Sequence, residues 1–203
     1  MKGNVYTLVY AAVLGTACAM VLTFAASFTA PYKKANAEAE EVKNILLALN
    51  VSVPDKASSE QLVEIYKENV QEQEQGDIKT YVYTPSTNND GGAIALRFVG
   101  PGLWGPIKGF LALDPKLTKI RGITFYEQEE TPGLGGDIVN ASFRDKFVGL
   151  MIRDEAGNPG IIIKNGGEAA ANKVDGISGA TMTCDKVQEM LNEAIQSIVE
   201  EKQ

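Results

Sequence analysis

Residues 175–200 of this 203-residue chain read DGISGATMTCDKVQEMLNEAIQSIVE, and they predict an amphipathic helix with a glycine-rich loop before it. The apolar side chains recur at helical spacing and form one stripe, made of Val187, Met190, Leu191, Ala194, Ile195 and Ile198. We expect Thr183 to be the N-cap, with Asp185 in the first turn. Because backbone amides at a helix N-terminus attract anions, the stretch suits a phosphate. The alternative, which the sequence supports equally, is that the hydroxyls of Ser178, Thr181 and Thr183 only cap the helix and bind no phosphate.

The composition excludes several kinds of site. The net charge of −7 disfavours a nucleic-acid binder, which usually carries a basic surface. The chain has no histidine, so it has no histidine general base, no Ser-His-Asp triad and no histidine-bound metal. Its two cysteines, Cys18 and Cys184, are too few for a zinc finger or an iron–sulfur cluster. We therefore expect no catalytic residue and no metal site, and chemistry supplied by a bound cofactor.

The chain begins with a long uncharged stretch, from Asn4 to Tyr32. Its apolar part is long enough to cross a bilayer as a helix, which takes roughly 20 residues. A cleaved signal peptide is the alternative, but Pro31 would directly follow a cut after Ala30, and the better small-residue pattern at 35–37 lies beyond two lysines. We favour an uncleaved single-pass anchor. Lysines flank both ends of the stretch, so charge does not decide its orientation.

We expect three parts: an anchor over 1–32, a helical neck over 33–77 and one α+β domain over 78–203. Within the last part, short β-prone runs between glycine, proline and aspartate predict antiparallel strands at 81–83, 93–99, 109–113, 120–126 and 160–163. A short helix is expected over 142–150, with its inward face formed by Phe143, Phe147 and Leu150.

The neck contains two helical patterns. The first covers 33–49 and can continue directly from the anchor. The second covers 59–70, where Ser58 as N-cap and Gln61 three residues later form a capping-box pattern. Residues 71–77, QEQEQGD, are expected to be a polar connector.

Two further glycine-rich stretches could line a ligand site. Residues 100–106 hold the only tryptophan, Trp104, which could stack on a flavin, although a lone tryptophan is more often part of a core. In residues 130–136, ETPGLGG, Thr131 and the glycines could hold a polar edge of the ligand while Leu134 packs on its ring; a plain turn is the alternative. Cys184 is interpreted as a small residue of the first helical turn rather than a redox group, although that position would lower its pKa.

Residues 175–181, DGISGAT, resemble the flavinylation motif of the covalent FMN-binding domain family. The resemblance implies FMN joined by a phosphoester bond to Thr181, with Thr183 as the nearby alternative, and installed by a separate flavin transferase. It places the phosphate beside Ser178, Gly179, Ala180 and Thr183, and the isoalloxazine against Glu130, Thr131, Leu134 and Gly135. Lys164 could offset the charge of the flavin or its phosphate, or be an ordinary surface lysine.

The whole chain is also similar to the C subunits of sodium-translocating NADH:quinone oxidoreductases. The similar segments follow in the same order: 4–7, 43–46, 102–105, 122–127 and 130–136. The chain is short for that family around 53–92, and its length suits the G subunits of Rnf ferredoxin-oxidising complexes. The resemblance implies an inner-membrane, single-pass subunit with a periplasmic domain, integral membrane partners, and electron relay from NADH to quinone coupled to sodium export. A tethered domain that binds flavin noncovalently, or senses it, and a structural assembly subunit are the alternatives.

Overall fold

The computed structural model describes residues 2–54, 57–75, 78–85 and 91–201, and it divides into two compact units, Met1–Ala39 and Glu40–Gln203. The first unit is formed by the helix α1 (Lys2–Ala48), whose last residues belong to the second unit. Pro31 lies inside α1 without ending it. The helix is long and apolar enough to cross a membrane by length and composition, and its apolar window is exposed. The expected apolar N-terminal helix, continuous with the helical pattern after it, is confirmed.

The second unit is built on an antiparallel sheet in the order β1-β2-β3-β4-β5. The strands are β1 (Val70–Gln75), β2 (Ile78–Tyr83), β3 (Ala93–Pro101), β4 (Pro106–Leu113) and β5 (Ile120–Glu127). Each strand pairs with the next along the chain, from Val70 opposite Tyr83 to Leu113 opposite Ile120. The expected antiparallel sheet is confirmed. The exception is the short pair β6 (Ile162–Ile163) and β7 (Lys173–Val174), which is parallel.

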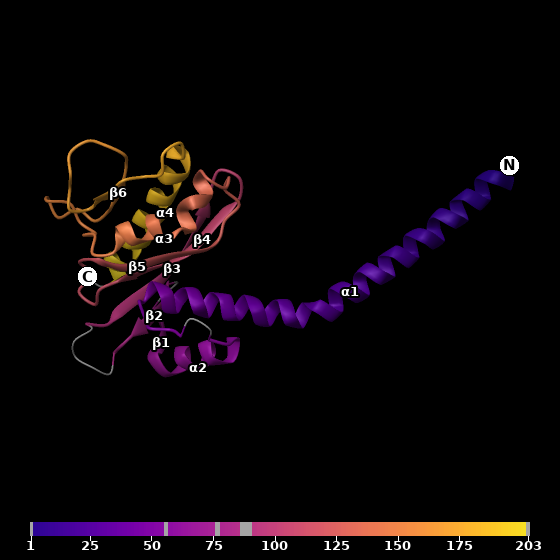
Figure 1. Ribbon diagram of the computed structural model, residues 1–203, viewed down its shortest axis with the longest axis horizontal. Coiled ribbons are helices and arrows are strands. Elements are labelled where there is room, and N and C mark those ends of the chain that lie inside the picture. The colour runs from indigo at the N-terminus through magenta and orange to yellow at the C-terminus, as the bar shows by residue number, and fades with distance from the viewer. Residues whose placement is uncertain (1, 55–56, 76–77, 86–90, 202–203) are drawn as a thin grey trace. The chain divides into compact units, whose positions relative to one another are not determined.

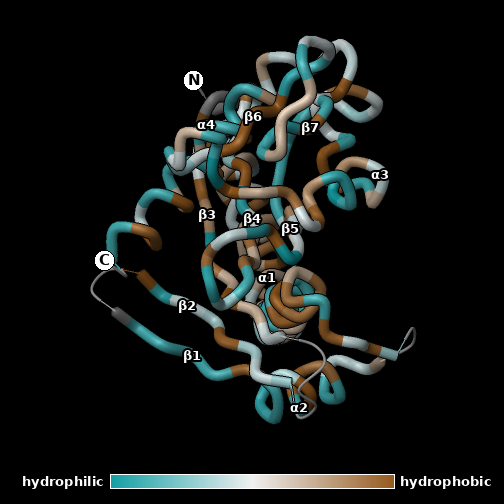
Figure 2. The backbone as a smooth tube through the Cα atoms, turned by 90° about the vertical axis from the view of Figure 1, so that its left-hand side faces the viewer, coloured by the Kyte–Doolittle hydropathy of each residue, from teal (hydrophilic) through white to brown (hydrophobic). Residues whose placement is uncertain are grey.

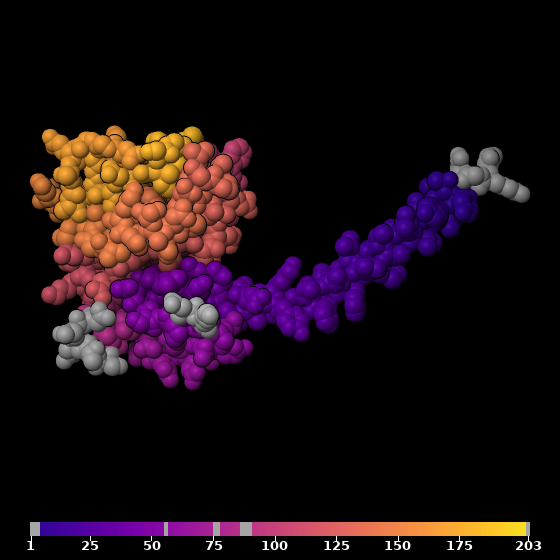
Figure 3. All heavy atoms as spheres, in the orientation of Figure 1, coloured from indigo at the N-terminus to yellow at the C-terminus, as the bar shows by residue number. Residues whose placement is uncertain are grey.

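Helices cover both faces of the sheet, so it is the middle of three layers (Figure 1). On one face, the end of α1 and the helix α2 (Ser59–Asn69) enclose a core with Phe110 and Tyr81. On the other, α3 (Ala141–Arg144), the short 3-10 turns η1 (Gly135–Val139) and η2 (Asp145–Phe147), and α4 (Thr181–Glu201) cover a larger core. In the space-filling view, the orange and yellow C-terminal residues form the upper layer of this unit, and the purple residues, which include the end of α1 and α2, form the lower layer (Figure 3).

The prediction of a connector over 71–77 is wrong for its described part, because residues 71–75 belong to β1. This strand reads VQEQEQ and lies at the edge of the sheet, where Figure 2 shows it as mainly hydrophilic. Its backbone pairs with β2, from Val70 to Gln75. An edge strand can be polar throughout because pairing uses its backbone, and charged side chains protect an exposed edge from aggregation. Residues 76–77 lie outside the described part of the chain.

Helix α4 carries the predicted buried stripe, in which Val187, Leu191 and Ile195 are fully enclosed. Its start differs from the prediction: the helix begins at Thr181, so Thr183 is its third residue rather than its N-cap, and Asp185 lies beyond the first turn. The expected helix over 142–150 consists of the short α3 and η2, but Phe143, Phe147 and Leu150 are buried as expected.

The capping box of α2 is confirmed and gives the first testable prediction. Ser58 Oγ accepts a hydrogen bond from the Gln61 N–H (3.3 Å), and Gln61 Oε1 accepts one from the Ser58 N–H (2.9 Å). We expect Ser58→Ala to lower the free energy of unfolding by about 1 kcal/mol, because a helix N–H loses its acceptor. Urea denaturation followed by circular dichroism measures this. Ser59→Ala, at the next position, is the matched control, and equal losses in both variants would contradict a capping role.

Candidate functional site

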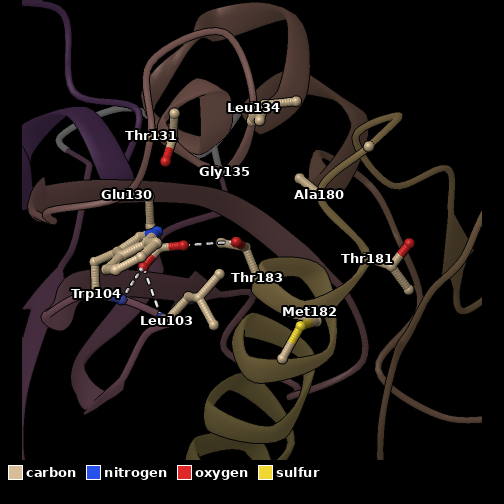
Figure 4. Close-up of a pocket in the computed structure, with 11 residues that line it drawn as sticks. Leu103, Trp104, Glu130, Thr131, Leu134, Gly135, Ala180, Thr181, Met182 and Thr183 are labelled. Carbon is tan, nitrogen blue, oxygen red and sulfur yellow. Dashed lines mark hydrogen bonds between the residues drawn. The ribbon is translucent and has the colours of Figure 1, made fainter.

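The three glycine-rich stretches meet at a pocket of about 220 Å³ in the second unit (Figure 4). The pocket is lined by Leu103, Trp104, Glu130, Thr131, Leu134, Gly135, Gly179, Ala180, Thr181, Met182 and Thr183. The β3–β4 connection, the segment after β5 and the start of α4 each supply part of this lining. Residues that are far apart in sequence are therefore neighbours in one site.

Glu130 is the buried polar centre of this pocket. It is only 4% exposed, and its carboxylate accepts hydrogen bonds from two other segments. Oε1 accepts hydrogen bonds from the backbone N–H groups of Leu103 (2.7 Å) and Trp104 (3.2 Å). Oε2 accepts one from the hydroxyl of Thr183 (2.6 Å), as Figure 4 shows. One carboxylate thus joins all three glycine-rich stretches.

Two glycines make room for this carboxylate. A Cβ at Gly102 would lie 2.6 Å from Glu130 Oε1, and a Cβ at Gly135 would lie 2.8 Å from Glu130 Oε2 and collide with Thr183 Oγ1. Real Cβ atoms essentially never approach so closely, so a side chain at either position would require the neighbouring atoms to shift. The glycines here serve close approach of backbone to side chain rather than turn formation alone.

Apolar side chains form the rim of the pocket. Trp104 is 69% exposed, and Leu134 and Met182 are also exposed. The expectation that a lone tryptophan belongs to a core is therefore wrong here. Its backbone lies in a tight loop closed by the Gly102 N–H to the Gly105 carbonyl (2.8 Å), which leaves the indole at the surface. Large exposed apolar groups beside a pocket are typical of a ligand site.

Thr181 is the first residue of α4 and is exposed at the pocket. Gly179, two residues earlier, has a φ of +79°, a left-handed conformation that favours glycine, and it turns the chain into the helix. Ala180 is buried beneath the turn. The arrangement presents a threonine hydroxyl beside the N-terminus of a helix of 21 residues, where backbone N–H groups favour a phosphate.

Two residues expected near the cofactor do not line the pocket. Ser178 is exposed in the loop that leads to Gly179, and Lys164 is exposed just after β6. Three lining residues are absent from the set that the resemblance implies: Leu103, Met182 and Trp104. The sequence singles out Trp104 as a candidate ring-stacking residue, whereas Leu103 and Met182 carry no pattern of their own and become recognisable only when the segments are brought together.

Cys184 is buried directly behind the pocket. Burial raises the pKa of its thiol, and this effect outweighs the lowering of the pKa by the hydrogen bond that Sγ accepts from the Ile177 N–H (3.3 Å). Cys184 lies in the first turn of α4, as expected, and a thiol with a raised pKa is a poor nucleophile. Among the residues that the structure describes, no group of three His, Cys, Asp or Glu side chains could hold a metal ion.

Residues 102–196 match the family model of the FMN-binding domain, a class of cofactor-binding domain. The curated relatives carry a more specific name than this domain family. The C subunit of the Na(+)-translocating NADH-quinone reductase of Yersinia pestis is 44% identical over 109 residues, which cover 51% of this chain and 41% of that protein. That of Vibrio parahaemolyticus is 40% identical over 109 residues, covering 53% and 42%. The chain thus spans about two-fifths of the length of these relatives.

The chain is also similar to solved structures. The C subunit of the Na(+)-translocating NADH-quinone reductase from Parabacteroides distasonis superposes with a TM-score of 0.70 at 28% identity, covering 84% of this chain and 94% of that one. NqrC from Shewanella oneidensis gives a TM-score of 0.66 at 20% identity, over 81% and 93%, and shows the shared fold. The resemblance to the FMN-binding domain family and to the C subunits is confirmed by these findings. Both curated relatives carry the name of the C subunit rather than that of an Rnf protein.

Proposed function

We propose that this chain is an electron-transfer flavoprotein subunit of a sodium-translocating NADH:quinone oxidoreductase, with FMN bound through a phosphoester bond to Thr181. One observation carries the proposal: the exposed hydroxyl of Thr181 opens a long helix at a pocket that has an apolar rim and a buried polar centre. The match of residues 102–196 to the FMN-binding domain family supports FMN as the ligand of this site.

Each part of the pocket suits a part of this ligand. The first N–H groups of α4 favour the phosphate beside Thr181. Trp104 and Leu134 offer apolar surfaces to a flat ring, and the backbone of the 130–136 segment offers polar groups to its edge. FMN supplies the electron transfer when it is bound, while the protein binds and orients it. No general base is needed for this task, in keeping with a chain without histidine.

The anchor and the partners follow from the same proposal. Helix α1 serves as a single-pass anchor in the inner membrane, supported by its length and its apolar, exposed surface. The FMN domain faces the periplasm or cell exterior, where a covalent bond keeps the cofactor from being lost. Other integral membrane subunits of the complex supply and accept the electrons, and a flavin transferase attaches the FMN.

The test is to co-express the full chain with a flavin transferase and to examine it on a denaturing gel. We expect flavin fluorescence in the protein band, because a phosphoester bond survives denaturation. A dark band, with the transferase active on a known substrate, would contradict covalent attachment. If the folded chain then released flavin on denaturation, the result would support the alternative, a tethered domain that binds flavin noncovalently.

A further inference from the structure

We propose that Glu130 is the positioning residue of the flavin site. Its carboxylate fixes the Trp104 loop to the first turn of α4. It thereby sets the distance between this loop, which offers a surface to the flavin ring, and Thr181, to which the flavin is attached. This inference rests on the proposed function, because it concerns the same pocket. It adds a role for a side chain that does not have to touch the cofactor.

The hydrogen bonds of Glu130 are divided between two walls of the pocket: the Trp104 loop (residues 102–105) and the first turn of α4. Oε1 holds the Trp104 loop through the N–H groups of Leu103 and Trp104, at 2.7 and 3.2 Å. Oε2 holds α4 through the hydroxyl of Thr183, at 2.6 Å. Each oxygen therefore serves a different wall.

Burial makes the loss of these hydrogen bonds costly. Glu130 is 4% exposed and Thr183 is 3% exposed, so water does not readily replace either partner. A buried polar group that loses its hydrogen bond keeps the cost of its desolvation. Gly102 and Gly135 lie so close to the two carboxylate oxygens that a Cβ at either position would collide with them.

Thr183 connects the carboxylate to the attachment point. It lies two residues after Thr181 within the same turn of α4, so fixing Thr183 also fixes the backbone of Thr181. On the other wall, the backbone of Trp104 is held while its indole stays free at the rim. Without Glu130 the flavin could still be attached, but the two walls would move independently, and a site that is present but loose binds its ligand poorly.

Three variants separate the contact of Glu130 with the Trp104 loop from its contact with α4. Glu130→Ala removes both contacts. Glu130→Gln keeps a carbonyl oxygen for the two backbone N–H groups and an amide that can donate to Thr183 Oγ1. Thr183→Val removes only the contact with α4. Glu127→Gln is the matched control, because Glu127 lies three residues earlier but is exposed and pairs with Lys108 (2.7 Å).

Hydrogen exchange of the full chain without flavin tests the contact directly. We expect the Leu103 and Trp104 amides to exchange at least tenfold faster in Glu130→Ala than in the wild type, and near the wild-type rate in Glu130→Gln and in Glu127→Gln. Wild-type exchange in Glu130→Ala, or equal acceleration in the control, would overturn the proposal. If circular dichroism shows that Glu130→Ala does not fold, the proposal is tested with Glu130→Gln and Thr183→Val in the second measurement.

The second measurement uses the flavin-loaded chain. Trp104 is the only tryptophan, so quenching of its emission by attached flavin reports the spacing of the two walls. We expect Thr183→Val to bind flavin covalently but to show a lower anisotropy of flavin fluorescence and a higher Trp104 emission, while Glu130→Gln resembles the wild type. Unchanged anisotropy and emission in Thr183→Val would overturn the role of Glu130. A wild type without covalent flavin would instead count against the proposed function, so the two failures are distinguishable.

Discussion

Thr181→Ala is expected to remove all covalently bound flavin from the chain. Alanine has no hydroxyl to form the phosphoester, and the nearest alternative hydroxyl is held elsewhere: Thr183 is buried and donates its hydrogen bond to Glu130. Ser178 is exposed but does not line the pocket. The measurement is flavin fluorescence of the denatured protein band after co-expression with a flavin transferase.

Two controls make this result specific. Thr181→Ser keeps a hydroxyl at the same position and is expected to retain some attachment, whereas Thr183→Val should retain attachment at Thr181. Since Thr181 is an exposed residue of the first helical turn, alanine there should leave the circular dichroism spectrum unchanged. Fluorescence that persists in Thr181→Ala would move the bond to another residue, with Thr183 as the first to examine.

Phe147→Ala is expected to cause a large loss of stability, about 3–5 kcal/mol in the free energy of unfolding. The Phe147 ring is fully enclosed and packs edge-on against Phe143, with ring centroids 5.2 Å apart. It belongs to the core that also holds the buried stripe of α4. Removing the ring leaves a cavity in this core.

Urea denaturation of the detergent-solubilised chain, followed by circular dichroism, measures the effect. Val148→Ala is the matched control because this neighbouring side chain is exposed, and we expect a change within about 0.5 kcal/mol. A comparable loss in both variants would show that the segment, rather than the buried ring, determines the stability.

The fold can be predicted where a local pattern coincides with burial. The stripe of α4 has a helical period because one side of the helix packs on the sheet, and the runs of β3, β4 and β5 are β-prone because both faces of these strands are covered. The capping box at Ser58 is recognisable because its partners are three residues apart. β1 cannot be recognised, because a polar edge strand is determined by its neighbour and not by its own side chains.

The site is predictable in its segments but not in its connections. The glycine-rich stretches indicate the places where backbone and ligand come close, and they supply most of the pocket lining. The hydrogen bond between Thr183 and Glu130 joins residues 53 positions apart, and no local pattern announces it. The sequence predicts that Thr183 caps its own helix, yet its hydroxyl serves a distant carboxylate. For Trp104 the sequence allows both a place beside a flavin and a place in the core; its loop holds the backbone and exposes the ring.

Peptide mass spectrometry tests the central claim most directly. Cleavage after Lys173 and Lys186 releases residues 174–186, which contain Thr181 and Thr183 on one peptide. From chain co-expressed with a flavin transferase, we expect this peptide to carry the mass of FMN minus one water, with fragment ions that assign the addition to Thr181. An unmodified peptide from a chain that releases its flavin on denaturation, or an addition assigned to another residue, would contradict the account.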